Sequence, residues 1–176
     1  MGRGVAAFRV VAGTAVDADP KLVERFLLDP GCFATWQHGM SGDIRATTSV
    51  LHTGTALEMT GRIGPFRLPY TIIVSEHVPG RNLSVRTTRG AVDLLVDFRW
   101  AREAGLTRMD VTIDGRSTRA KSWLVPVLGA ASRRNLQRNL DGLRRTLESG
   151  DFAFTVPSPL TDHPPHSSGE PLPAFP

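Results

Sequence analysis

The chain has 176 residues, of which 40% are hydrophobic and 22% charged, so it is long enough for one domain with a sizeable core. No apolar run approaches the ~20 residues that cross a membrane, and the only cysteine, Cys32, excludes an internal disulfide and a cysteine-based zinc site. The formal net charge is +4, with arginines spread along the chain. Because the chain has a single cysteine, we expect a cytoplasmic protein in a reducing compartment.

The N-terminal part of the sequence predicts a strand followed by two short helices. Residues 8–16 are rich in β-forming side chains and give the strand. Asp19-Pro20 then supplies an N-cap with proline at the first helical position, and apolar pairs four residues apart carry the helix to about Leu28. Asp29-Pro30 repeats the same start signal, which predicts a second short helix over 31–36.

The middle of the chain, from Ser41 to Gly115, shows no helical period and is divided by turn signals such as Pro79-Gly80. Strands are expected at 43–51, 55–63, 66–78, 82–88, 92–100 and 107–114. The last two alternate apolar and polar residues, which is typical of an antiparallel sheet covered on one side only.

The stretch from Lys121 to Ser149 has the clearest helical period in the chain. Ser122 is a plausible N-cap, Pro126 is tolerated in a first turn, and Gly150 is a good stop. One face carries a leucine stripe formed by Leu136, Leu140, Leu143 and Leu147. We predict an α+β fold in which this helix lies across a curved antiparallel sheet of about six to seven strands.

The first half of the same helical face carries small residues, because the stripe continues backwards through Ser132, Gly129 and Val125. Protein interiors pack densely, so small residues there indicate either a closely packed neighbour or a space. We interpret them as a space, which predicts a cavity beside Gly129 and Ser132.

Residues 151–176 differ in composition from the rest of the chain. They contain seven of the 13 prolines and show no helical or strand period. We therefore predict one domain over 1–150 and a mostly disordered, Pro-rich tail over 151–176 that folding does not require. The segment Phe152-Ala-Phe154 can still dock on the domain.

Five short motifs occur in the order found in one known superfamily. They are Asp29-Pro30 with Trp36, Gly54-Thr55, the hairpin from Glu76 to Leu83, the turn Gly105-Leu106-Thr107-Arg108, and Leu140 to Glu148 at the end of the long helix. Together they resemble the SRPBCC or START-like superfamily (helix-grip, Bet v 1-like), in its polyketide cyclase/dehydrase-like or lipid-binding branch. The resemblance covers about Val5 to Ser149 and implies a deep apolar cavity between the sheet and the last helix.

Cavity-lining residues follow from this implied cavity together with the strand and helix patterns. The expected lining is Trp36, Met59, Tyr70, Phe98, Trp100, Met109, Val111, Val125, Gly129, Ser132 and Leu136. No catalytic residue is assigned, since His38, His52 and His77 are more typical of surface histidines and no nucleophile motif occurs. No metal site and no cofactor are expected, because metal-ligand spacings and nucleotide-binding glycine motifs are absent from the sequence.

Three functions remain open from the sequence. The first is binding of a hydrophobic or polycyclic small molecule, lipid or polyketide-like, in the cavity. The second is a cyclase, aromatase or dehydratase type of enzyme, which needs at least two polar side chains converging in the cavity. The third is a co-chaperone-like interaction module, whose contact surface would be the arginines of the long helix. These arginines are Arg133, Arg134, Arg138, Arg144 and Arg145, and such a cluster is more typical of a solvated helix face. Neither nucleic-acid binding nor integral membrane association is expected.

Overall fold

The computed structural model describes residues 6–37, 44–63, 66–90, 92–117 and 125–154. The chain begins with a strand and two short helices, continues with six strands and ends in one long helix. In order they are β1 (Ala6–Val16), α1 (Pro20–Leu28), α2 (Pro30–Trp36), β2 (Arg45–Ala46), β3 (Ala56–Ile63), β4 (Phe66–Val78), β5 (Asn82–Arg89), β6 (Asp93–Glu103), β7 (Leu106–Ser117) and α3 (Val125–Ser149).

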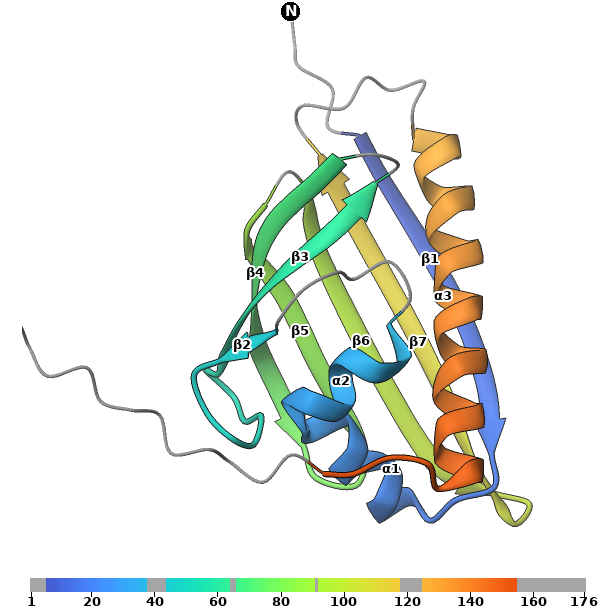
Figure 1. Cartoon of the computed structure of the whole chain (residues 1–176). Coiled ribbons are helices and arrows are strands. Elements are labelled where there is room, and N and C mark those ends of the chain that lie inside the picture. Colours follow the sequence, from blue (N-terminus) through green and yellow to red (C-terminus); the bar gives the residue numbers. More distant parts are fainter. Residues whose placement is uncertain (1–5, 38–43, 64–65, 91, 118–124, 155–176) are drawn as a thin grey trace, which may run out of the picture.

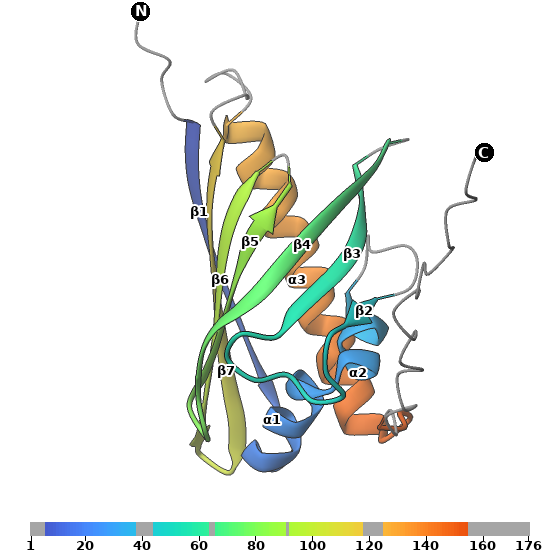
Figure 2. The same cartoon turned by 90° about the vertical axis from the view of Figure 1, so that its left-hand side faces the viewer.

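The strands form one antiparallel sheet in the order β1-β7-β6-β5-β4-β3-β2. The sheet curves, and α3 lies along its inner side beside β1, while α1 and α2 cover one end (Figure 1 and Figure 2). This arrangement confirms the predicted α+β fold with a long C-terminal helix. Because β1 pairs only with β7, the first strand of the chain is also an edge of the sheet.

The two short helices begin where the Asp-Pro pairs predict. The carboxylate of Asp19 accepts a hydrogen bond of 2.8 Å from the backbone N–H of Lys21 and caps α1. Asp29 ends α1 and starts α2, where its carboxylate accepts hydrogen bonds from the N–H groups of Gly31 and Cys32 at 2.8 and 3.0 Å. One aspartate therefore joins the two helices into a fixed corner.

The strand expected at 43–51 is much shorter in the structure, where β2 covers only Arg45–Ala46. The backbone N–H of Thr47 still donates to the Ala56 carbonyl at 3.1 Å, but side-chain hydrogen bonds follow it: the Thr48 hydroxyl contacts the Val50 carbonyl at 2.8 Å and the Thr55 hydroxyl at 3.1 Å. The backbone N–H of Leu51 donates to the Leu28 carbonyl at 2.8 Å. Threonine hydroxyls thus offer the backbone an alternative to the sheet, and the segment follows the end of α1.

The leucine stripe of α3 forms a central part of the core. Leu136, Leu140, Leu143 and Leu147 are all buried, as predicted. The structure describes the helix from Val125, with Pro126 as its second residue, while Lys121 and the expected N-cap Ser122 lie outside the described residues. Gly150 follows with a φ of 67°, the left-handed conformation that glycine adopts readily, and stops the helix.

The small residue Gly129 of α3 lies against Phe8 of β1. A Cβ atom added at Gly129 would be 3.7 Å from the Phe8 Cβ, an ordinary van der Waals contact. The Phe8 ring in turn covers Gly115 of β7, its cross-strand partner, so closely that a side chain at Gly115 would collide with the ring. At this point the helix therefore has a neighbour in van der Waals contact, which is the alternative to a space that a small residue allows.

The segment from Asp151 to Phe154 packs on the short helices. The Phe152 ring contacts Phe26 edge to face, with centroids 5.0 Å apart, and Phe154 at 5.3 Å. The guanidinium of Arg25 lies 3.7 Å from the centroid of the Phe154 ring. Contacts with the domain thus continue past Gly150 to Phe154; residues 155–176 lie outside the described part of the chain.

Among the described helices, none combines the length and the apolar character needed to cross a lipid bilayer.

Candidate functional site

An apolar cavity of about 170 Å³ lies between the inner face of the sheet and the helices α2 and α3. Its walls come from seven elements and the residue after α2, and most of its lining side chains are apolar or aromatic. They are Phe33, Trp36, Gln37, Met59, Tyr70, Ile72, Val85, Thr87, Leu94, Val96, Phe98, Ile113, Asn135, Leu136 and Asn139.

The register of the strands places the side chains that line the cavity on one face of the sheet. Directly paired residues of antiparallel strands point to the same face, so the pair Met59 and Tyr70 faces the cavity together. A second row runs across three strands, because Val85 pairs with Val96 and Val96 pairs with Ile113. Alternation along each strand therefore supplies the apolar floor.

An aromatic cluster closes the cavity on the α2 side. Trp36 packs edge to face on Phe33 of the same helix, with centroids 5.5 Å apart, and on Phe98 of β6 at 6.1 Å. All three side chains are buried. Because Asp29 caps α2 and fixes its start, it also determines the positions of Phe33 and Trp36 on that helix.

Five uncharged polar side chains also line the cavity. Asn135 and Asn139 of α3 lie one turn apart on the flank of the leucine stripe, and Gln37 follows the end of α2. From the sheet come Tyr70 and Thr87. Both asparagines line the cavity beside Leu136 of the leucine stripe, while α3 contacts the sheet mainly at β1.

Tyr70 is the one lining residue, among those described, whose side chain titrates. Burial disfavours the charged phenolate and raises the pKa of Tyr70 to about 12. The phenol is therefore neutral at physiological pH, and its hydroxyl interacts as a hydrogen-bonding group, not as a charge.

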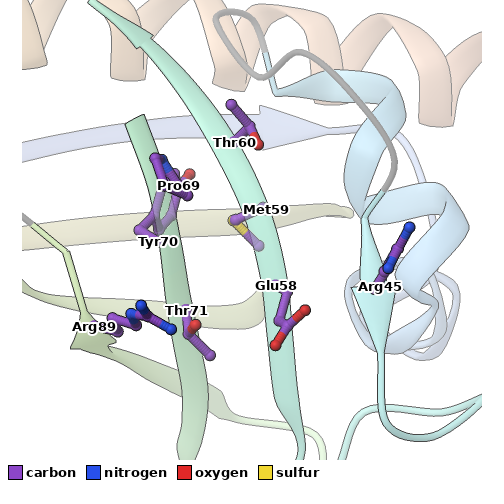
Figure 3. Close-up of a pocket in the computed structure, with 8 residues that line it drawn as sticks. All are labelled: Arg45, Glu58, Met59, Thr60, Pro69, Tyr70, Thr71 and Arg89. Atoms are coloured by element: carbon purple, nitrogen blue, oxygen red, sulfur yellow. The ribbon is translucent and has the colours of Figure 1, made fainter. Parts of the chain in front are cut away.

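A second hollow, of about 390 Å³, lies on strands β2 to β5 and shares Met59 and Tyr70 with the cavity (Figure 3). Its charged residues form one cross-strand row in which Arg45 pairs with Glu58, Glu58 with Thr71 and Thr71 with Arg89. This row alternates along the strands with the cavity-facing residues, so it belongs to the opposite face of the sheet. Arg45, Glu58 and Arg89 are exposed, and the hollow is much more polar than the cavity.

The family profile described as polyketide cyclase / dehydrase and lipid transport matches residues 7–148. The chain belongs to this family. Membership confirms the resemblance drawn from the five short motifs and implies a hydrophobic ligand-binding cavity. No curated protein sequence matches the chain.

Several solved structures resemble this family member over most of its length. The protein TTHA0849 from Thermus thermophilus has 13% sequence identity and a TM-score of 0.70, covering 82% of this chain and 100% of its own. The structure titled Ara h 8.0201 has 11% identity and a TM-score of 0.64, covering 83% and 99%. Norcoclaurine synthase from Thalictrum flavum, in complex with dopamine and hydroxybenzaldehyde, has 13% identity and a TM-score of 0.65, covering 87% and 96%. At such identities the similarity shows the helix-grip, Bet v 1-like fold alone.

The residues expected to line the cavity fall into two groups. Trp36, Met59, Tyr70, Phe98 and Leu136 are among its lining residues. The cavity lining does not include Trp100, Met109 and Val111, which are buried elsewhere in the core. It also does not include Gly129 and Ser132 of α3. The side chain of Val125 is not among those that the structure describes. Sequence reasoning missed ten lining residues, the apolar Phe33, Ile72, Val85, Leu94, Val96 and Ile113 and the polar Gln37, Thr87, Asn135 and Asn139. For the last two a signal existed, since asparagines four residues apart flank the leucine stripe.

The described histidines lie outside the lining of this cavity. The Nε2 atom of His77 lies 2.9 Å from Oε1 of Glu24, whose carboxylate also accepts hydrogen bonds of 3.1 Å from the backbone N–H of Gly80. This clamp ties α1 to the turn between β4 and β5. The Nδ1 atom of His52 lies 3.0 Å from the Thr53 carbonyl, and His38 is outside the described residues.

Cys32 is equally unsuited to nucleophilic chemistry. It is fully buried on α2, and burial raises the pKa of its thiol to about 11, with the nearby Asp29 carboxylate adding to the shift. Within the described ranges, no three His, Cys, Asp or Glu side chains are grouped to hold a metal ion.

Proposed function

We propose that this protein binds a hydrophobic small molecule, lipid or polyketide-like, in the cavity between the sheet and α3. The observation that carries the proposal is the cavity itself, with an apolar sheet floor and an aromatic end wall. Its volume of about 170 Å³ suits one aromatic ring, since an apolar cavity of ~150 Å³ holds benzene. A polycyclic ligand would extend from it toward the rim near Asn135, which is exposed.

A cyclase or dehydratase activity is the second candidate, because five polar side chains meet in the cavity. Acid–base catalysis at neutral pH needs a group whose pKa lies near the working pH. Amide and threonine side chains do not titrate there, and the pKa of Tyr70 is about 12. The described lining can therefore orient a ligand by hydrogen bonding, and it offers less for moving protons. This balance favours binding over catalysis.

The test compares two neighbouring residues of β6 that face opposite sides of the sheet. Val96 is half-buried at the cavity, whereas Leu95 is 38% exposed on the outer face. Val96→Phe would place a ring in the cavity, so it should abolish binding of the neutral apolar dye N-phenyl-1-naphthylamine while the melting temperature holds. Leu95→Phe is the matched control and should bind the dye like the wild type.

One combination of results would contradict the small-molecule proposal. A wild-type protein that does not bind the dye, together with a strong loss of stability in Val96→Phe, would mean a filled core, in which overpacking costs ~1–3 kcal/mol. That result would overturn the small-molecule proposal. Native mass spectrometry of the purified protein would complement the titration by giving the mass of any ligand retained from the expressing cell.

A further inference from the structure

Three of the five polar side chains of the cavity are amides on its helical side, and the other two are Tyr70 and Thr87 on the sheet. Asn135 and Asn139 form a short ladder on α3, about one helical turn apart, which places their Cβ atoms ~6 Å from each other along the wall. Asn135 is exposed and Asn139 is only 9% exposed, so the ladder runs from the rim to the interior. Gln37, which is half-buried, adds a third amide at the end of α2.

Apart from the hydroxyls of Tyr70 and Thr87, the facing walls are apolar. Trp36 and Phe98 present aromatic surface, and the row of Val85, Val96 and Ile113 presents aliphatic surface. A ligand seated in this space would have one side in contact with hydrocarbon and the other along the amides. The cavity is therefore amphipathic, and it is matched to a molecule with an apolar ring and a polar edge.

Charge is the second property of the lining. The lining residues within the described part of the chain include no arginine, lysine, histidine or carboxylate. Each amide can both donate and accept hydrogen bonds, so the ladder can satisfy a carbonyl, a hydroxyl or another amide. A carboxylate would lose its hydration shell on entry without gaining a cation, and burial of an unpaired charge is strongly unfavourable.

We infer that this cavity selects an uncharged ring compound bearing a carbonyl, amide or hydroxyl group, and that it excludes a carboxylate of the same shape. Asn135 and Asn139 are the residues that determine this specificity. The inference rests on the proposed function, because it concerns the ligand class of the same cavity. It separates neutral aromatic ketones, amides and phenols from free fatty acids and aromatic acids.

The experiment uses three probes of nearly equal size on the full chain at pH 7. Benzamide is neutral and polar, benzoate is its anionic counterpart, and toluene has no polar edge. Each is titrated against bound N-phenyl-1-naphthylamine, and its displacement constant is read from the dye fluorescence. We expect benzamide to displace the dye at a concentration at least about tenfold lower than benzoate requires, since each tenfold step corresponds to about 1.4 kcal/mol.

Helix variants then assign the selectivity to residues. Asn139→Leu keeps the branched shape of the side chain and removes the amide, so the preference for benzamide over toluene should fall about fivefold, as expected for one lost hydrogen bond. Asn135→Leu changes only the exposed rim of the cavity, so it replaces Asn139→Leu in this test if that buried variant does not fold. Gln137→Leu is the control on the solvent side of α3, where Gln137 is exposed and bonds to Asp141 at 3.2 Å; it should leave all three constants unchanged.

Three failures can be told apart. If the dye binds and benzoate displaces it as well as benzamide does, the charge selectivity is overturned while small-molecule binding stands. If the dye does not bind at all, the proposed function fails and the inference fails with it. If the dye binds but both asparagine variants keep the benzamide preference, the assignment to the α3 ladder is overturned.

Discussion

Gly129 of α3 is packed directly against Phe8 of β1, with the position of its missing Cβ 3.7 Å from the Cβ of Phe8. The same phenylalanine ring lies over Gly115 of β7. One aromatic side chain thus fills the gap left by two glycines, one on the helix and one on the sheet. This packing gives a structural reason for the glycine at position 129 of α3.

Gly129→Ala should stabilise the protein by about 0.5–1 kcal/mol. Alanine has the higher helix propensity, and its methyl group would make only an ordinary contact with Phe8. Urea unfolding measures the change. Gly115→Ala is the contrasting variant and should destabilise, because its methyl group would collide with the Phe8 ring. A destabilised Gly129→Ala would show that α3 sits closer to β1 than described.

Truncation after Gly150 should lower the melting temperature by several degrees. It removes Phe152 and Phe154, which pack on Phe26 and beneath Arg25, and partial aromatic burial of this kind is worth about 1–2 kcal/mol. Truncation after Phe154 keeps these contacts and should leave the melting temperature unchanged. Equal melting temperatures for the two truncations would show that the aromatic contacts contribute nothing.

The thiol of Cys32 offers an independent probe of the same contact, because its Sγ lies 3.7 Å from the carbonyl of Ala153. Cys32 is the chain's only cysteine, so a thiol reagent reports on this position alone. We expect slow labelling of the native protein and faster labelling after Phe152→Ala. Phe154→Ala should have a smaller effect, since that ring contacts Phe152 and Arg25 nearer the surface.

Alkaline titration should show a single tyrosine ionising with a midpoint near pH 12. Tyr70 is the only tyrosine, so the ultraviolet difference spectrum reports it directly. Its pKa is raised in the folded state, and the unfolded chain therefore releases the proton first. The stability contributed by the neutral phenol is fully present below pH 10 and is lost as the pH rises from about 10 to about 12. Tyr70→Phe should lack this pH dependence; a midpoint near 10 in the wild type would mean that the phenol is solvated.

Replacing Arg134, Arg138 and Arg145 together with glutamine should change the free energy of unfolding by less than about 0.5 kcal/mol per residue. All three side chains are exposed on α3. Dye binding should also be unaffected, because none of them lines the cavity. A pull-down that loses a salt-sensitive partner in this variant would instead support the interaction-module alternative.

Much of the fold could be predicted from local patterns. The two Asp-Pro pairs placed α1 and α2, strand alternation placed β6 and β7, and the leucine stripe placed the buried face of α3. Each of these signals depends on residues close in the sequence. The expected strand at 43–51 was too long because threonine hydroxyls compete with ladder hydrogen bonds, which alternation alone does not reveal.

The position of the cavity was harder to predict, because it depends on which distant side chain fills each gap. Sequence shows that Gly129 is small, but not that Phe8, far away in the chain, covers it. It shows asparagines at 135 and 139, but not that the fold brings both of them to the wall of the cavity. Tertiary neighbours decide both points, and helical period carries no information about them.

The edge position of β1 has a consequence for how this protein is made. Its sole partner in the sheet is β7, so that Ala6 pairs with Ser117 and Val16 with Thr107. A ribosome adds ~5–20 residues per second, so the first strand leaves the exit tunnel many seconds before its partner exists. During that interval its apolar face, including Phe8 and Val10, has neither β7 nor α3 to cover it. Nascent chains of this protein should therefore depend on chaperone protection of their first residues until synthesis is nearly complete.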